Sequence, residues 1–505
     1  MEKWNIPFEV SDICQKLEDN KFEAHLVGGC VRDLILDLKP KDWDITTNAS
    51  PEEIIGLFQE TFYENEYGTV GVVNQKTTDE TLRVIEVTPY RIEGEYSDKR
   101  RPDSVIFSKN LLDDLKRRDF TINAISLRLT LRNEKTRDKK ENGGLFYGEI
   151  TDPYDGHADI KRGLIKAVGK PSERLGEDAL RALRAIRIGA EYGFTIENKT
   201  AEAILAHSGL LKHIARERIR DEFFRIVMSP RPLMGLELTR KLKILPYIAP
   251  EFDKSVGVGQ NSAHSFDVWE HSLRSLQHAA DKNWSLEVRL AALLHDMAKP
   301  DTKRWETKKK DWSFYGHDVV GARKAQKILE NLRVSGKTTD TVTKLVRWHM
   351  FFSDTEKITL SAVRRLLSKV GKDLIWHLMD LRACDRIGTG RPKESPYRLR
   401  KYKSMIEEVM RDPVSVAMLA IDGKKIIEIG KLSPEPRIGY ILHILLEEVL
   451  EDPKKNSPEL LEKRVRELCA LPEKELELLG KKSKERKEEE EEKDLTKIRK
   501  KYFVS

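Results

Sequence analysis

The sequence has little cysteine, no long apolar run and no secretion signal at its N-terminus. Its 505 residues include four cysteines that lack the close spacing of a metal-binding cluster or disulfide framework: Cys14, Cys30, Cys384 and Cys469. No apolar stretch approaches the ~20 residues that a membrane-spanning helix needs. These absences exclude a disulfide-stabilised secreted domain and a membrane-spanning protein. We expect a soluble protein of the cytoplasm, where thiols stay reduced.

Charged residues are abundant, but the two signs nearly balance. They make up 35% of the chain, and the formal net charge is +7. This mild basic excess is compatible with an RNA partner but does not by itself indicate one. The length is sufficient for roughly three or four domains, each with its own core. Composition leaves the oligomeric state open.

The most informative segment is Leu26-Val-Gly-Gly-Cys-Val-Arg-Asp33, which is followed by the carboxylates Asp42 and Asp44. A buried strand that ends in Gly28 and Gly29 can bring backbone N–H groups close to a phosphate, because no side chain stands in the way. Side chains at i and i+2 of a strand share a face, so Asp42 and Asp44 can hold Mg²⁺ beside that phosphate. The two motifs together predict phosphoryl or nucleotidyl transfer.

A third carboxylate is expected on the next strand. The segment Arg83-Val-Ile-Glu-Val-Thr-Pro-Tyr-Arg91 alternates like a β-strand and isolates Glu86 among apolar neighbours. A buried lone carboxylate is costly unless it is paired or binds a metal. We therefore expect Glu86 to complete or support the metal site and to act with Asp42 and Asp44 in catalysis. The alternative is a glutamate on the strand surface.

A basic cluster follows at Lys116-Arg-Arg-Asp-Phe-Thr-Ile-Asn-Ala124. Guanidinium groups bind phosphate bidentately, and Asp and Asn side chains suit ribose hydroxyls. We therefore expect Arg118, Asp119 and Asn123 to contact the triphosphate and sugar of a nucleotide, and Arg32 to steady the same triphosphate. The alternative is a helix capped by Asp119, with a solvated basic flank.

These motifs, in this order, resemble motifs A and B of the class II tRNA nucleotidyltransferase and bacterial poly(A) polymerase family. The resemblance covers roughly residues 20–235 and rests on the glycine pair with Arg32-Asp33, on Asp42-x-Asp44 and on Arg117-Arg-Asp-x-x-x-Asn-Ala124. The family also has a base-reading helix, which this chain matches at 174–187. One departure is Leu175-Gly176, where the family commonly shows Phe and another residue.

The base-reading segment can also be interpreted from its residues. Arginines recur every third position at Arg181, Arg184 and Arg187, beside an apolar stripe. Asp178 and Arg181 would lie side by side and imitate the pairing edge of a base, which selects CTP or ATP without a template. Arg184 and Arg187 would reach phosphates. The alternative is an amphipathic helix with a solvated basic face.

The polar segment 91–102 bears on which nucleotides are added. In the family, such a loop is associated with switching the pocket from CTP to ATP. Its presence argues against an enzyme that adds only C. The alternative is a solvated hairpin tip.

A second group of metal-ligating residues lies beyond residue 255, in the order His, His-Asp, His, His, Asp. Imidazole and carboxylate ligands together suit a transition metal such as Ni²⁺, Co²⁺ or Mn²⁺. The order resembles the HD phosphohydrolase superfamily, which implies a primary metal set of His271, His295, Asp296 and Asp385. The same resemblance implies that His317 and His349 are second-metal or phosphate ligands.

The expected fold class is an α+β nucleotidyltransferase head, a mixed sheet with helices, followed by all-α neck, HD and tail domains. Composition shifts and turn-rich segments divide the chain into a catalytic head, a neck for base selection and RNA binding, an HD domain, a helical tail and a charged low-complexity extension: 1–150, 151–235, 255–400, 401–480 and 481–505.

The combined reading is a tRNA nucleotidyltransferase that adds CCA to tRNA 3′ ends from CTP and ATP. Mg²⁺ would be its cofactor, and the HD domain would add phosphatase or phosphodiesterase activity with a second metal. An A-only tRNA nucleotidyltransferase and a poly(A) polymerase of the same family are the nearest alternatives. An alternative of another class is an HD phosphohydrolase whose N-terminal half merely binds nucleotide or RNA.

Overall fold

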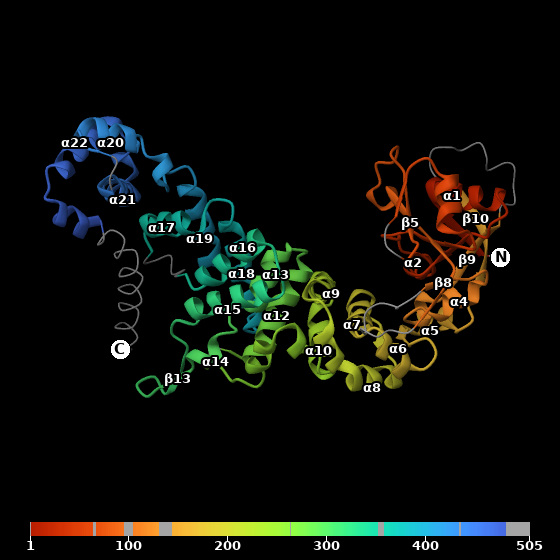
Figure 1. The fold of residues 1–505 in the computed structure, drawn as a ribbon. Coiled ribbons are helices and arrows are strands. Elements are labelled where there is room, and N and C mark those ends of the chain that lie inside the picture. The colour runs from red at the N-terminus through yellow and green to blue at the C-terminus, as the bar shows by residue number, and fades with distance from the viewer. Residues whose placement is uncertain are drawn as a thin grey trace. The chain divides into compact units, whose positions relative to one another are not determined.

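The structure is a computed structural model that describes residues 2–63, 67–94, 105–130, 144–262, 264–351, 358–433 and 436–480. It divides into two compact units, Met1–Pro250 and Glu251–Ser505 (Figure 1). The boundary falls between the expected end of the neck at 235 and the expected start of the HD domain at 255; the finer division into five parts stays a prediction. Most of the proposed CTP-to-ATP loop and the whole extension 481–505 lie outside the described residues.

The first unit is built on an eight-stranded mixed sheet. From edge to edge the strands are β1 (Glu2–Ile6), β10 (Gly144–Thr151), β9 (Ser126–Thr130), β2 (His25–Val27), β3 (Asp44–Thr47), β6 (Val84–Pro89), β5 (Val70–Val73) and β4 (Thr61–Tyr63). β3 and β6 run parallel, and the other neighbours are antiparallel. In β6, Ile85 and Val87 are buried while Glu86 between them is exposed, so the strand has one core face and one open face.

Short helices complete the head. They are α1 (Phe8–Asp19), α2 (Gly29–Ile35), α3 (Pro51–Leu57) and α4 (Leu111–Lys116), with a small hairpin of β7 (Arg91–Glu93) and β8 (Val105–Phe107). Helix α2 directly follows β2, as the glycine-pair motif predicts. Gly28 precedes it with φ +77°, a backbone conformation that glycine adopts without strain.

A helical neck ends the first unit. It contains α5 (Gly156–Arg162), α6 (Pro171–Glu177), α7 (Leu180–Tyr192), α8 (Asn198–His207), α9 (Arg216–Met228), α10 (Pro232–Lys241) and α11 (Leu245–Ile248), with the short strands β11 (Leu164–Ile165) and β12 (Thr195–Ile196). Helix α7 packs against α9 and α10. Its apolar stripe, Leu180, Leu183 and Ile186, is buried as the pattern predicts. The helix stops at Gly193, which is left-handed and closes the C-terminal turn.

The second unit is helical over its described residues, apart from one hairpin. Its helices are α12 (Val268–Asp281), α13 (Leu286–Leu294), α14 (Lys299–Thr302), α15 (His317–Asn331), α16 (Gly336–Trp348), α17 (Leu360–Val370), α18 (Ile375–Gly388), α19 (Tyr397–Val409), α20 (Gly423–Gly430), α21 (Pro436–Glu451) and α22 (Pro458–Cys469). The hairpin consists of β13 (Arg304–Glu306) and β14 (Asp311–Ser313). Helix α13 is buried from Val288 to Leu294 and packs against α12, α16 and α18. It therefore forms the centre of this unit.

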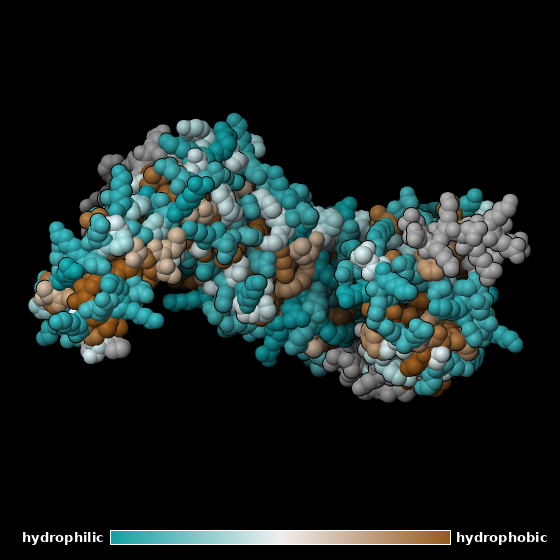
Figure 2. All heavy atoms as spheres, turned by 90° about the horizontal axis from the view of Figure 1, so that it is seen from above, coloured by the Kyte–Doolittle hydropathy of each residue, from teal (hydrophilic) through white to brown (hydrophobic). Residues whose placement is uncertain are grey.

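The face of the molecule drawn in Figure 2 is mostly hydrophilic, with hydrophobic residues gathered in separate patches. Among the described residues, no helix combines the length and apolar character that a membrane crossing requires.

Candidate functional sites

Asp44 and Glu86 lie directly opposite each other at the centre of the sheet. They pair in register on the parallel strands β3 and β6, and the backbone N–H of Glu86 donates to the carbonyl of Trp43 at 3.1 Å. Glu86 is exposed rather than buried, so the expectation of a costly buried carboxylate is wrong. The register nevertheless places the backbones of Glu86 and Asp44 side by side, and their shared metal site stays a prediction.

Gly28 fits closely between Asp44 and Arg118. A Cβ at position 28 would stand 2.9 Å from Arg118 Nη1 and 3.3 Å from Asp44 Oδ2. Glycine therefore keeps open a space lined by one carboxylate and one guanidinium. Arg118 is held there by Asp114, whose Oδ2 accepts hydrogen bonds from its Nε and Nη2.

The charge of Asp44 is poorly compensated by the protein. Burial raises the pKa of Asp44, Arg118 opposes this effect, and the charge of Asp42 raises the pKa further. Asp42 is exposed and lies in the bend before β3 rather than on the strand. The prediction that both carboxylates share one face of a strand is therefore wrong. Two such carboxylates with an oxygen-only donor set suit a hard divalent cation.

The basic motif forms a buried network instead of standing free. Asn123 Oδ1 accepts from Arg32 Nη1 at 2.8 Å, and Asn123 Nδ2 donates to Asp119 Oδ1 at 3.0 Å. Arg32 also binds Asp33, and its guanidinium lies over the ring of Tyr192, 4.3 Å from the centroid. In this arrangement the polar groups of Arg32 and Asn123 bind neighbouring side chains of the protein. Direct contact of either residue with a nucleotide stays a prediction.

The expected base-reading helix is two helices. Asp178 ends α6 in an extended conformation, and its Oδ1 accepts from the N–H of Leu180 as α7 begins. The guanidinium of Arg181 donates to Glu177 Oε2 at 2.5 Å and to the carbonyl of Arg117 at 3.3 Å. The backbone N–H of Arg181 donates to the carbonyl of Asp178. The side chain of Arg181 connects α7 to the basic motif of the head through the carbonyl of Arg117.

The other two arginines of α7 have different surroundings. Arg184 Nη2 lies 2.9 Å from Asp119 Oδ2, and its charge reaches Asp44. Burial disfavours the ionised form of Asp119, but Arg184 and Asn123 outweigh it and lower the pKa of Asp119 to about 2. Arg187 instead binds Glu222 at 2.7 Å and Glu191 at 2.8 Å and is buried. Arg184 therefore faces the candidate site, whereas a phosphate contact from Arg187 would require these ion pairs to open.

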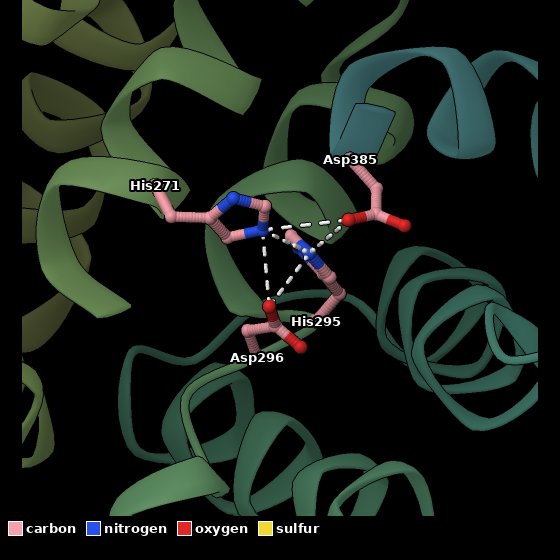
Figure 3. A group of neighbouring side chains, drawn as sticks. All are labelled: His271, His295, Asp296 and Asp385. Atoms are coloured by element: carbon pink, nitrogen blue, oxygen red, sulfur yellow. Dashed lines mark hydrogen bonds and ion pairs between the residues drawn. The ribbon is translucent and has the colours of Figure 1, made fainter. Parts of the chain in front are cut away.

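The second unit brings the four residues of the predicted primary metal set together (Figure 3). His271 lies within α12, His295 and Asp296 follow α13, and Asp385 lies in α18. His271 Nε2 is 3.0 Å from His295 Nε2, 3.0 Å from Asp296 Oδ2 and 3.5 Å from Asp385 Oδ1. Figure 3 shows all four side chains pointing to one space.

His317 and His349 form a second group on the other oxygen of Asp296. Their Nε2 atoms are 3.2 Å apart and lie 3.3 and 3.7 Å from Asp296 Oδ1. Asp296 is therefore shared by two ligand groups, each of which could hold a metal ion.

The histidine tautomers favour metal binding. Nδ1 of His295, His317 and His349 each bonds the backbone carbonyl three residues earlier, at 2.9, 2.6 and 2.7 Å. In the neutral rings Nδ1 therefore carries the proton and Nε2 offers a lone pair. Two lone pairs 3.2 Å apart, at His317 and His349, repel each other unless a metal ion or a proton lies between them. The nitrogen and oxygen donors fit a transition metal.

The pKa shifts of the cluster agree with this chemistry except at His295, where burial is outweighed by the charge of Asp296, which raises the pKa. Burial alone would raise the pKa of Asp296, but His295 and Lys299 hold it well below its ordinary value. Burial, with the neighbouring His295 and His317, lowers the pKa of His349. Ionised carboxylate and neutral imidazole are the forms that ligate metals.

Three positioning residues were missed by the sequence reasoning. Asp114 is fully buried and binds Arg117 and Arg118, a spacing of three and four residues that a helix pattern could have indicated. Lys299 Nζ lies 2.6 Å from Asp296 Oδ2, also one helical turn away. Tyr192 is 159 residues from Asp33, to which its hydroxyl donates, and no local pattern points to it.

Three segments match protein-family models. Residues 24–166 match the "Poly A polymerase head domain", residues 193–255 the "Probable RNA and SrmB- binding site of polymerase A", and residues 268–389 the "HD domain". These matches define a polymerase-type nucleotidyltransferase head followed by RNA-binding and HD segments.

Similar proteins extend over nearly the whole chain. A CCA-adding enzyme of Lactobacillus helveticus is 30% identical over 90% of this chain and 96% of its own length. Another, from Lactobacillus delbrueckii subsp. bulgaricus, is 31% identical over 88% and 94%. The crystal structure of the Bacillus stearothermophilus CCA-adding enzyme in complex with CTP has 26% identity and a TM-score of 0.67, covering 91% of this chain and 97% of that one. The chain belongs to the CCA-adding enzyme family.

Proposed function

We propose that this protein adds CCA to tRNA 3′ ends from CTP and ATP, without a template. The observation that carries the proposal is the pairing of Asp44 with Glu86 beside the space that Gly28 keeps open. Family membership and the likeness to a CTP-bound CCA-adding enzyme support the same activity.

The proposed residue roles follow from the geometry. Asp42 and Asp44 would hold Mg²⁺, which supplies charge neutralisation for nucleotidyl transfer when bound. Glu86, in register with Asp44, would orient that carboxylate. Arg118 and Arg184 place positive charge near Asp44, where they would neutralise phosphate oxygens of the incoming nucleotide. Asp178 and Arg181 would present the edge that selects the base.

An assay with three RNA substrates tests this function. They are a tRNA lacking its CCA end, a tRNA ending in CC and an unrelated RNA, each with labelled CTP or ATP. CTP incorporation on the first substrate followed by one A is expected. ATP addition only after CC would identify an A-only enzyme, and long A tracts on the unrelated RNA would identify a poly(A) polymerase.

We also propose a metal-dependent phosphohydrolase activity for the second unit. The specific observation is Asp296, which faces two groups of ligands through its two oxygens. A transition metal held there would supply Lewis acidity toward a phosphate ester. Lys299 neutralises part of the charge of Asp296. Hydrolysis of a phosphomonoester or cyclic phosphodiester, assayed with Ni²⁺, Co²⁺ or Mn²⁺, tests this activity, and loss of nucleotide without any addition would make it the sole function.

Because tRNA and nucleotides are the proposed substrates, we propose the cytoplasm as the working compartment.

A further inference from the structure

The hairpin of the second unit carries an unusual pair of tryptophans. Trp305 in β13 and Trp312 in β14 are cross-strand partners, with ring centroids 5.2 Å apart in an edge-to-face arrangement. They are 53% and 37% exposed, the two tryptophans with large exposed surfaces among the described residues. Exposed aromatic faces of this size fit a partner that stacks on them.

The two rings differ in how they are held. Lys303 Nζ lies over the ring of Trp312, 4.4 Å from the centroid, and also donates to the carbonyl of Gly259. Trp312 is thus fixed between Lys303 and Trp305. Trp305 is the more exposed of the pair, so its ring is the more accessible surface for stacking by a partner.

The turn of the hairpin is strongly basic. Residues 303–315 include five cationic side chains and two carboxylates. The carboxylates are already engaged, Asp311 with Ser262 and Glu306 with Lys309. Lys308 and Lys310 are exposed, and neither makes an ion pair or side-chain hydrogen bond within the described part of the chain. Stabilising a two-stranded hairpin explains the tryptophan pair, but it does not explain these lysines.

The hairpin is directly connected to the HD ligands. On its N-terminal side the hairpin follows Lys299, which contacts Asp296. On its C-terminal side it is followed by Phe314, whose carbonyl accepts from Nδ1 of His317. Trp312 is two residues before Phe314, about 7 Å of extended chain. Figure 1 shows the β13 hairpin projecting beyond α14.

We propose that the β13–β14 hairpin binds single-stranded RNA. Trp305 stacks on an unpaired base, and Lys308 and Lys310 contact the flanking phosphates. Aromatic stacking with a cationic groove is how proteins bind single strands without reading their sequence. The inference rests on the proposed function only in assuming that the protein handles RNA, and it assigns to the HD side of the chain an RNA contact of its own.

The test measures binding of the full chain to a labelled single-stranded RNA of about 12 nucleotides over a range of salt concentrations. Trp305→Ala should weaken binding at least about 5-fold, with Trp305→Phe restoring most of it. Lys308→Gln with Lys310→Asn should lower the slope of log K against log salt by about 1.4, since each lost phosphate contact removes about 0.7. The matched control, Lys327→Gln with Lys337→Gln, removes the same charge from exposed positions on α15 and α16 and should leave the slope unchanged.

Several results would overturn the proposal. Wild-type affinity in Trp305→Ala, an unchanged slope in the turn-lysine variant, or an equal drop in the control variant would each do so. Incorporation of CTP and ATP is measured in parallel on the tRNA lacking CCA. If the hairpin variants bind RNA normally while incorporation proceeds, this inference alone fails. If the wild-type protein incorporates nothing, the proposed function fails instead.

Discussion

Asp44 faces Glu86 across two parallel strands that are separated by 42 positions in the sequence. We propose that Glu86 supports Asp44, a carboxylate whose own pKa is raised by burial and by Asp42. We expect Asp42→Ala with Asp44→Ala to abolish incorporation of CTP and ATP, with far-UV circular dichroism unchanged. Glu86→Gln, which keeps the shape, should reduce incorporation by roughly 10- to 100-fold, as for other outer-shell partners of metal ligands. Retained incorporation by the double variant would remove the assignment of this site.

Arg181 should affect base choice and also stability, because it is buried and paired with Glu177. We expect Arg181→Ala to weaken selection of CTP and ATP by about 1 to 3 kcal/mol, the value of a bidentate base contact. Competition among the four nucleotides measures this effect.

Arg187 provides the control on the same helix. Arg187→Ala removes the cation that Glu222 binds and leaves Glu191 paired with Arg225, so it should lower the free energy of unfolding by about 3 to 5 kcal/mol and leave the order of nucleotide preference intact. If the two variants change selection equally, α7 acts on the base only through its general packing.

The HD centre should be separable from incorporation. His295→Ala with Asp296→Ala removes the shared carboxylate and one imidazole, and should abolish hydrolysis in the presence of Ni²⁺, Co²⁺ or Mn²⁺. Incorporation of CTP and ATP should stay near the wild-type rate. His349→Ala should reduce metal stoichiometry, measured by equilibrium dialysis, because only the second ligand group is affected. A wild-type protein that binds none of these metals and hydrolyses nothing would make the cluster structural.

His25 should make folding stability depend on pH. Burial lowers the pKa of His25 from 6.5 to about 4, so the folded protein holds fewer protons than the unfolded chain between these values. Its contribution is therefore fully present above pH 6.5 and is lost as the pH falls toward 4, by about 3 kcal/mol in total. Urea unfolding of wild-type protein and His25→Asn across this range should show a shallower pH dependence in the variant. If the stability of the two proteins changes equally with pH, groups other than His25 determine the pH dependence.

The local motifs could be predicted because each follows from short-range chemistry. The strand, the glycine pair and the helix appear at β2, Gly28 and α2 because a positive φ selects glycine. The HD ligands assemble because helix ends place histidines and carboxylates on one centre. Asp178 also carried a signal of the helix break, since an Asp two residues before an apolar run caps its first turn.

Long-range pairings were beyond the sequence. The exposure of Glu86 depends on which face of β6 the core covers, and a single carboxylate does not reveal it. Arg187 is engaged by Glu222, 35 residues away on α9, so its periodic spacing with Arg184 was misleading. The β13–β14 hairpin did leave a pattern, with Arg304-Trp-Glu and Asp311-Trp-Ser on either side of a lysine turn, but helical neighbours obscured it.

Gly28 and Gly29 look equivalent in the sequence, yet only one of them is irreplaceable. Position 28 combines φ +77° with Arg118 Nη1 2.9 Å from an added Cβ, whereas at position 29 an added Cβ would lie at an ordinary 3.6 Å from Arg32 Nη2. Natural variants and engineered libraries should therefore accept alanine at 29 more readily than any side chain at 28, where the backbone would be strained. A saturation library scored for growth or incorporation should recover few substitutions at position 28 and several at position 29.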